Sequence, residues 1–263
     1  MIFYFSASGN SLWLAQQLAT ATNDNLVNMA DALLKDKCSF VLQRNENIGF
    51  VLPVYGWDLP PIVRQFISQM ELQEQTENYL FLACTCGDDS GRMLQRFRRE
   101  LRPKNLHVHS AFALRMPNTY VCLPGFDVDS PVLTKEKLHA APLRIKQIAQ
   151  SIILHEKGIF QTRPGSFPRL KTHVLGRFFQ AFLMTDKPFH TTSACTSCGI
   201  CVHSCPLRNI LLQDGHPQWN GHCTGCLSCY HHCPTHAIAF GRHTKNKGQY
   251  LLKNVLSDSP LDQ

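Results

Sequence analysis

Eight cysteines toward the C-terminal end carry the clearest chemical signal in this sequence. They form two copies of one motif, Cys-x2-Cys-x2-Cys-x3-Cys-Pro, at residues 195–206 and 223–234. Thiolates are strong ligands for soft transition metals, and the short spacing lets several thiolates of one copy reach the same metal centre. The chain opens at Met1 without a recognisable export signal. We therefore expect a cytoplasmic, reducing environment, in which such cysteines bind metal rather than form disulfides.

Iron–sulfur clusters and zinc are the two metal centres to weigh against each other. Zinc sites usually take two Cys-x2-Cys pairs separated by a longer loop, which does not call for a cysteine triplet. The repeat instead resembles the bacterial ferredoxin pattern, which holds two [4Fe–4S] clusters, with the fourth cysteine of each copy binding the other cluster. The first ligand set implied by this resemblance is Cys195, Cys198, Cys201 and Cys233. The second ligand set is Cys223, Cys226, Cys229 and Cys205.

A second region whose residues could bind a ligand is the loop SASGNS at residues 6–11. It lies between an apolar segment and an amphipathic one, so we expect it to lead from a strand into a helix. Its serine hydroxyls, Gly9 and the free N–H groups of the helix start could bind a phosphate group. It lacks the lysine of nucleoside-triphosphate loops and the three glycines of dinucleotide loops. The alternative is an ordinary helix capped by serine.

The elements that position this loop are predicted by hydrophobic patterning over residues 1–157. Near-continuous apolar runs that alternate with amphipathic ones are typical of a parallel sheet with helices on both faces. The predicted strands are 2–6, one within 25–42, 47–54, 79–85 and 107–116. The predicted helices are 11–22, 59–70, 92–101 and 134–156, the last with Pro142 inside it. The prediction is an α/β domain with a doubly wound, five-stranded parallel sheet.

Ligands of such sheets bind at the carboxyl ends of the strands. Three further strand ends therefore qualify, at residues 53–60, 84–91 and 116–120. Tyr55 and Trp57 offer flat surfaces for an aromatic ring, while Thr85 and Gly87 offer backbone contacts.

SASGNS resembles the phosphate loop of flavodoxins, commonly Thr-x-Thr-Gly-Asn-Thr, with serines in place of threonines. The resemblance implies a flavodoxin-like domain that binds FMN. With the segment PVYGW and the double cysteine repeat, almost the whole chain is similar to the EFR1 family of flavodoxin–ferredoxin fusions. The FMN contacts implied in this way are Ser6, Ser8, Gly9, Asn10, Ser11, Pro53, Tyr55, Gly56, Trp57, Thr85, Cys86, Gly87, Asn118 and Tyr120.

The composition changes along the chain suggest four parts. A flavodoxin-like domain at 1–157 is followed by a linker at 158–190 that contains a docking helix over 169–184. A small α+β, bacterial ferredoxin-like domain with two [4Fe–4S] clusters occupies 191–241, and a polar C-terminal tail occupies 242–263.

The excess of basic over acidic residues indicates which kinds of partner the protein could bind. Lys and Arg outnumber Asp and Glu by 26 to 19, and the excess gathers in the stretches 92–104 and 157–187. No nucleic-acid-binding motif accompanies these charges, and no apolar stretch is long enough to span a membrane. A solvated helix face is one interpretation; docking of an acidic redox protein, as donor or acceptor, is the other.

FMN exchanges one or two electrons, whereas each cluster exchanges one. The sequence therefore predicts an electron-transfer protein that links one-electron and two-electron partners. Two alternatives stay open at this point. One is an iron–sulfur flavoprotein oxidoreductase that reduces a small molecule, and the other is a redox-sensing regulatory or binding module. No residue in the sequence identifies itself as a catalytic acid or base.

Overall fold

The computed structural model describes residues 1–75 and 77–257. These residues form two compact units, each assembled from separate stretches of the chain. Unit 1 comprises residues 1–6, 10–117 and 131–178. Unit 2 comprises residues 7–9, 118–130 and the chain from residue 179 onward. The last six residues of the predicted C-terminal tail, 258–263, lie outside the described residues.

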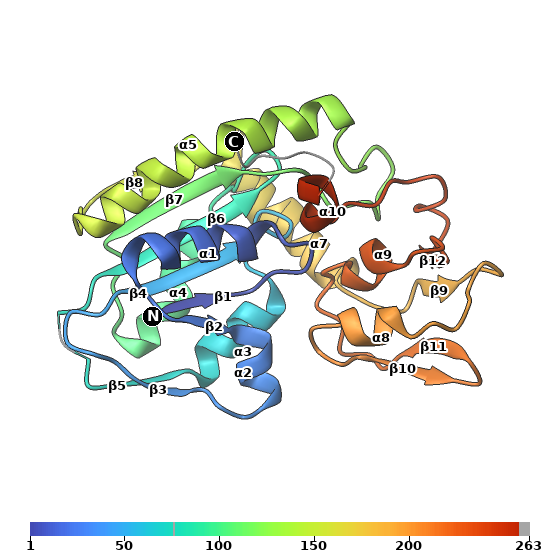
Figure 1. The fold of residues 1–263 in the computed structure, drawn as a ribbon, viewed down its shortest axis with the longest axis horizontal. Helices are drawn as coiled ribbons and strands as arrows, with labels where there is room; N and C mark the ends of the chain where they lie inside the picture. The colour runs from blue at the N-terminus through green and yellow to red at the C-terminus, as the bar shows by residue number, and fades with distance from the viewer. Residues whose placement is uncertain (76, 258–263) are drawn as a thin grey trace. The chain divides into compact units, whose positions relative to one another are not determined.

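Unit 1 is built on a six-stranded parallel sheet (Figure 1). In spatial order its strands are β2 (Leu26–Asn28), β1 (Ile2–Tyr4), β4 (Ile48–Pro53), β6 (Leu80–Cys86), β7 (Ser110–Arg115) and β8 (Phe160–Gln161). The first five strands follow the order 2-1-3-4-5 along the chain, which is the flavodoxin-like, doubly wound order. The predicted fold class is thus confirmed.

The central strands are buried because both faces of the sheet are covered. Every residue of β6 is buried, as are five of the six residues of β4. Of the covering helices, α1 packs against α5, and α3 packs against both α2 and α4. The helices of this unit are α1 (Asn10–Thr22), α2 (Met29–Leu34), α3 (Pro61–Gln69), α4 (Met93–Leu101), the 3-10 turn η1 (Arg102–Lys104) and α5 (Pro131–Ile153).

Two strands differ from the sequence prediction. The sheet has a sixth strand, β8, which pairs with β7 through Ala111↔Phe160 and Phe112↔Gln161. Both residues of β8 are exposed, so no hydrophobic pattern indicates it. The window 25–42 contains two strands: β2 joins the main sheet, while β3 (Ser39–Val41) pairs with β5 (Glu71–Gln73) in a separate two-stranded sheet.

The segment predicted as one helix over 169–184 is divided into three. These are α6 (Pro168–Leu170), a π-helical turn η2 (Lys171–Leu175) and α7 (Gly176–Phe182). π-turns within helices are rare and often occur at functional sites. Thr172 within η2 is fully buried, although its neighbour His173 is exposed.

Unit 2 contains two short antiparallel ribbons that repeat one arrangement. Its elements are β9 (Phe189–Thr191), α8 (Ile200–Ser204), β10 (Ile210–Gln213), β11 (His216–Trp219), α9 (Ser228–His232), β12 (Ile238–Phe240) and α10 (Leu252–Ser257). Ile210 faces Trp219 in the ribbon β10–β11, and Ile238 faces Thr191 in the ribbon β9–β12. The short helices α8 and α9 each begin after a residue with positive φ, Gly199 or Leu227.

The chain after β12 packs into unit 2. Tyr250, Leu251 and Leu252 are buried, and the Gln249 side-chain amide donates hydrogen bonds to the carbonyl oxygens of Tyr230 and Cys233. Over the part of the chain that the structure describes, no helix is both long enough and apolar enough to cross a membrane.

Candidate functional site

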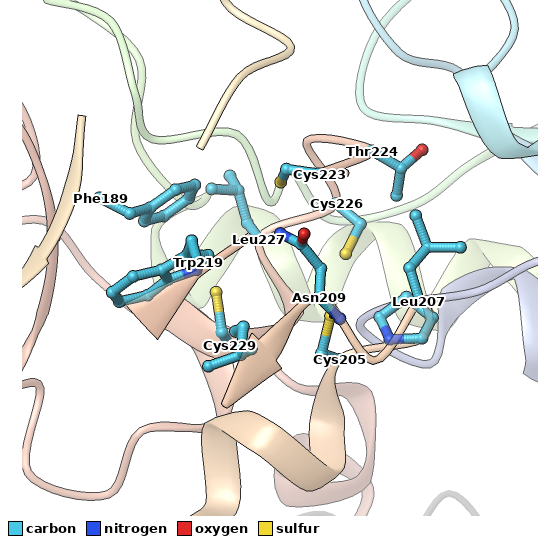
Figure 2. Close-up of a pocket in the computed structure, with 12 residues that line it drawn as sticks. Phe189, Cys205, Leu207, Asn209, Trp219, Cys223, Thr224, Cys226, Leu227 and Cys229 are labelled. Carbon is cyan, nitrogen blue, oxygen red and sulfur yellow. The ribbon is translucent and has the colours of Figure 1, made fainter. Parts of the chain in front are cut away.

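The cysteines of the two motifs lie around two hollows in unit 2. Four of them, together with Trp219, Phe189 and Asn209, line the first hollow, and Figure 2 shows their sulfur atoms directed toward one region. These four cysteines are Cys205, Cys223, Cys226 and Cys229. Three belong to the second motif and one to the first, which is the combination implied for the second cluster.

The second hollow is lined by the other four cysteines, Cys195, Cys198, Cys201 and Cys233. Three come from the first motif, and Cys233 ends the second. This hollow reaches the surface at Cys198, which is exposed, whereas Cys201 and Cys233 are buried. Ile200 and Leu212 also line it and are partly exposed.

Backbone N–H groups point at several of these sulfurs. Asn209 N donates to Cys205 Sγ at 3.3 Å, and Gly225 N donates to Cys223 Sγ at 3.3 Å. Ala237 N donates to Cys233 Sγ at 3.2 Å. Such donors stabilise sulfur in its negatively charged form, as a metal ligand requires.

Burial acts in the opposite direction. It raises the pKa of Cys223 to about 11 and also raises the pKa values of Cys201, Cys226 and Cys229. A thiolate in such surroundings needs positive charge beside it. Among the described residues, no three His, Cys, Asp or Glu side chains are close enough to hold one metal ion. The four thiols of each hollow therefore line it without meeting at a point.

A buried histidine supports the second motif through hydrogen bonds and does not line either hollow. His231 Nε2 lies 2.8 Å from the Thr119 carbonyl oxygen, and Tyr250 N donates to His231 Nδ1 at 3.2 Å. Burial lowers the pKa of His231 to about 4. This side chain is neutral at physiological pH and supports α9.

The loop at 6–11 follows β1 and leads into α1. Gly9 has φ +102°, a conformation that L side chains rarely adopt, and a Cβ there would lie 3.0 Å from Leu252 Cβ. The Ser8 carbonyl accepts a hydrogen bond from Leu252 N at 2.9 Å. Ser228 Oγ donates to the Ser204 carbonyl at 2.8 Å and lies 3.4 Å from the Ala7 carbonyl oxygen. Leu252 and Ser228 therefore contact residues 7–9 within unit 2, and sequence reasoning did not single them out.

The flanks of the same loop belong to unit 1. Ser6 is half-buried, while Asn10 and Ser11 are buried at the start of α1. Ser11 Oγ shares a hydrogen bond of 2.7 Å with Thr85 Oγ1 at the end of β6. Asn10 Nδ2 donates to the Pro117 carbonyl at 3.1 Å. The ends of β1, β6 and β7 are thus tied together.

The candidate contacts that follow β4 form a tight turn. Pro53 faces Thr85 across the sheet, and Tyr55 pairs with Asp58. Between them Gly56 and Trp57 both have positive φ, 56° and 59°. Cys86 is the last residue of β6, and burial raises the pKa of its thiol to about 12, which disfavours the thiolate form. The Gly87 carbonyl accepts a hydrogen bond from Arg115 Nε at 3.4 Å.

Residues of η2 and α7 pack on this turn. Thr172 Oγ1 donates to the Trp57 carbonyl at 3.3 Å and accepts from Arg92 N at 2.9 Å. A Cβ at Gly176 would lie only 2.7 Å from the Gly56 carbonyl oxygen. Lys171 Nζ stands 5.7 Å from the centroid of the Trp57 ring. Because their partners are distant in sequence, no local pattern could have marked Thr172 or Gly176.

The remaining candidates, Asn118 and Tyr120, belong to unit 2. Asn118 N and Nδ2 donate to the Asp129 carboxylate at 3.1 and 3.3 Å. The Tyr120 ring packs against Phe179 at 4.9 Å between centroids. The Tyr120 hydroxyl is buried and has no hydrogen-bond partner among the described residues.

Two families match separate parts of the chain. Residues 1–118 match the family described as a flavodoxin domain, and residues 194–238 match the family described as a 4Fe-4S dicluster domain. The two matches are consistent with a fusion of a flavodoxin domain and a 4Fe-4S dicluster domain. These two domain types support a redox role in electron transfer.

No curated protein matches the chain. Among the solved structures similar to it is a rubredoxin oxygen:oxidoreductase from the anaerobe Desulfovibrio gigas, with 11% identity and a TM-score of 0.31. The match covers 57% of this chain and 36% of that chain. Another is the Trp repressor binding protein from Bacillus subtilis, with 13% identity and a TM-score of 0.33, over 56% and 98% of the two chains. Neither likeness carries an argument about function.

Proposed function

We propose that this protein is an electron carrier that holds FMN and two [4Fe–4S] clusters, and that it is a member of the EFR1 family of flavodoxin–ferredoxin fusions. Bound together, these groups would exchange electrons with both one-electron and two-electron partners. The observation that carries the proposal is the pair of cysteine-lined hollows. Each hollow takes three cysteines from one motif and one from the other.

The donor set fits an iron–sulfur cluster in each hollow. Four thiols line an apolar hollow, and backbone N–H groups point at their sulfurs. In a tetrahedral zinc site with Zn–S distances of ~2.3 Å, the four sulfurs would converge on one ion. In the proposal, Cys205 and Cys233 each bind the cluster of the opposite motif and so fasten the two halves of unit 2 to each other.

The FMN proposal rests on the loop at 6–11 and on the strand ends. Ser6, Ser8 and Ser11 supply hydroxyl groups, and the start of α1 supplies N–H groups for the phosphate. Gly9 adopts a positive φ that turns the backbone of the loop, and a side chain at this position would lie in close contact with Leu252. The flavin ring is assigned to the strand-end residues Pro53–Trp57 and Thr85–Gly87, with Asn118 and Tyr120 as further contacts.

An acidic redox protein is the proposed partner, and it would dock on the basic surface of unit 1. The two basic stretches meet in the structure: Arg92 Nη1 and Arg96 Nη2 lie 3.2 and 3.4 Å from the ring nitrogens of His173. Further basic side chains on α4 and α7 are exposed, among them Arg99 and Arg177. Like charges gathered in this way attract an oppositely charged surface over a distance.

Paired substitutions test the crossed ligand sets. Cys198→Ser alone should remove one cluster and leave about four irons per chain, since each cubane holds four. Adding Cys233→Ser should change nothing further, because both cysteines belong to the same set. Adding Cys205→Ser to Cys198→Ser should instead remove the second cluster as well.

Cys84→Ser is the matched control, since this buried cysteine of β6 lies outside both motifs and should leave the iron content unchanged. The opposite pattern of iron loss in the two double variants would show that the ligand sets are not crossed. Iron and acid-labile sulfide are measured after anaerobic purification.

A further inference from the structure

The indole N–H of Trp219 is a buried donor without a hydrogen-bond partner among the described residues. A buried, unpaired N–H group costs free energy, so one in a folded protein calls for an explanation. Trp219 lines the hollow that contains Cys205, Cys223, Cys226 and Cys229.

The position of the indole ring is fixed from two sides. Trp219 ends β11 and faces Ile210 in the antiparallel ribbon. Its ring stacks on Phe189, with centroids 5.4 Å apart and an interplanar angle of 12°, and Phe189 in turn packs against Phe240. The side chain is therefore held in one orientation beside the hollow.

Within the hollow, the indole lies beside Cys229, as Figure 2 shows. An N–H group directed at this sulfur would favour its negatively charged form over the neutral thiol.

The other half of the repeat lacks this donor. Thr191 and Trp219 each lie four residues before the first cysteine of their motif. Thr191 faces Ile238 in its ribbon as Trp219 faces Ile210. The equivalent position of the first repeat therefore carries no indole, and no tryptophan is among the described residues that line the second hollow, so the two sites differ in this respect.

We propose that the Trp219 indole N–H donates a hydrogen bond to the Cys229 sulfur when that sulfur ligates iron, and that it raises the reduction potential of this cluster but not of the other. The inference rests on the proposed function, because it requires two bound clusters. Reduction adds one electron from an external donor and breaks no bond. The added negative charge is shared by the ligand sulfurs, so the N–H group stabilises the reduced state more than the oxidised state.

Trp219→Phe tests the proposal, because phenylalanine keeps the stacking on Phe189 and removes the N–H group. The potentials are measured by dithionite titration of the anaerobic protein, followed by electron paramagnetic resonance. Cys198→Ser, which retains only the cluster of Cys229, assigns the signals. We expect the equilibrium constant for reduction of this cluster to fall about three- to tenfold, or roughly 30–60 mV at ~59 mV per tenfold.

Thr191→Val, at the equivalent position of the first repeat, is the control and should leave both potentials unchanged. Unchanged potentials in Trp219→Phe, or an equal fall in both, would overturn the proposal. A second measurement needs no substitution: with tryptophan labelled by ¹⁵N in the indole ring, pulsed electron paramagnetic resonance of the reduced wild-type protein should detect ¹⁵N coupling to one cluster. The absence of this coupling also overturns the proposal. Wild-type protein without iron and sulfide would overturn the proposed function as well as this inference. Protein that holds both clusters but shows none of the expected effects of Trp219 would overturn the inference alone.

Discussion

The Asp186 carboxylate accepts a hydrogen bond from Asn209 Nδ2 at 2.9 Å, and both side chains are buried. The same carboxylate oxygen, Oδ2, accepts from Gly221 N at 2.8 Å, and Asn209 Oδ1 accepts from His222 N at 2.7 Å. Asp186 and Asn209 therefore fix the turn that leads directly into Cys223.

Asn209→Leu should loosen this turn and weaken the binding of one cluster. The substitution leaves the buried Asp186 carboxylate and the His222 N–H short of a partner each, at a cost of about 1–3 kcal/mol per group. We expect faster iron loss to a chelator from the cluster of Cys223, with the other cluster retained. Asn254→Leu, on α10, serves as the control. Equal loss from both clusters would contradict this role.

Ser11 and Thr85 offer a test of the loop–strand connection in unit 1. Thr85→Val leaves the buried Ser11 hydroxyl without its partner, which should lower the free energy of unfolding of unit 1 by about 1–3 kcal/mol. Ser11→Ala combined with Thr85→Val should cost less than the sum of the single changes. Urea unfolding followed by circular dichroism measures these effects. Additive costs would indicate that the two hydroxyls do not interact.

His109 makes unit 1 sensitive to pH. Its Nδ1 accepts a hydrogen bond from Leu80 N at 2.9 Å, and burial, followed by the nearby Lys157 charge, lowers the pKa of His109 below its usual value. Between the unfolded pKa of about 6.5 and this lower value, the unfolded chain binds more protons than the folded chain. The free energy of unfolding should therefore fall as the pH falls from about 6.5.

His109→Gln removes the titrating group but keeps an acceptor for Leu80 N. The urea midpoint of the variant should vary less between pH 7.5 and 5.5 than that of the wild-type protein. Identical pH profiles for the two proteins would contradict the assignment, since the other titrating groups are common to both.

The basic surface predicts salt-sensitive electron delivery. With a reduced acidic ferredoxin as the donor, the second-order rate constant should fall by roughly tenfold or more as the ionic strength rises, because salt screens the attraction. Arg99→Glu with Arg177→Glu should reproduce this loss at low salt. Lys35→Glu with Lys37→Glu, the same charge change at the end of α2, should have a smaller effect. A rate constant that does not respond to ionic strength would exclude electrostatic docking.

The main sheet could be predicted from the sequence because its signal is local. The strands β4 and β6 are buried on both faces, so each reads as a continuous apolar run, and helices separate them in the chain. β8 could not be predicted, because its two residues are exposed and join the sheet only through backbone pairing with β7.

The motifs of the candidate sites could also be found in the sequence, but their supports could not. The cysteine motifs are local patterns of nearby residues in the sequence. The contacts of Leu252 with Ser8 and of Thr172 with Trp57 instead join segments far apart in the chain. The meeting of the two basic stretches at His173 also depends on tertiary packing. The ligand sets, the FMN contacts and the domain boundaries stay predictions.

Cofactor content measures the central proposal most directly. The full chain, purified without oxygen, is assayed for iron, acid-labile sulfide, zinc and flavin in the same preparation. The account predicts about eight irons and eight sulfides per chain, as two cubanes require, together with one FMN. Colourless protein that holds zinc and neither sulfide nor flavin would contradict it.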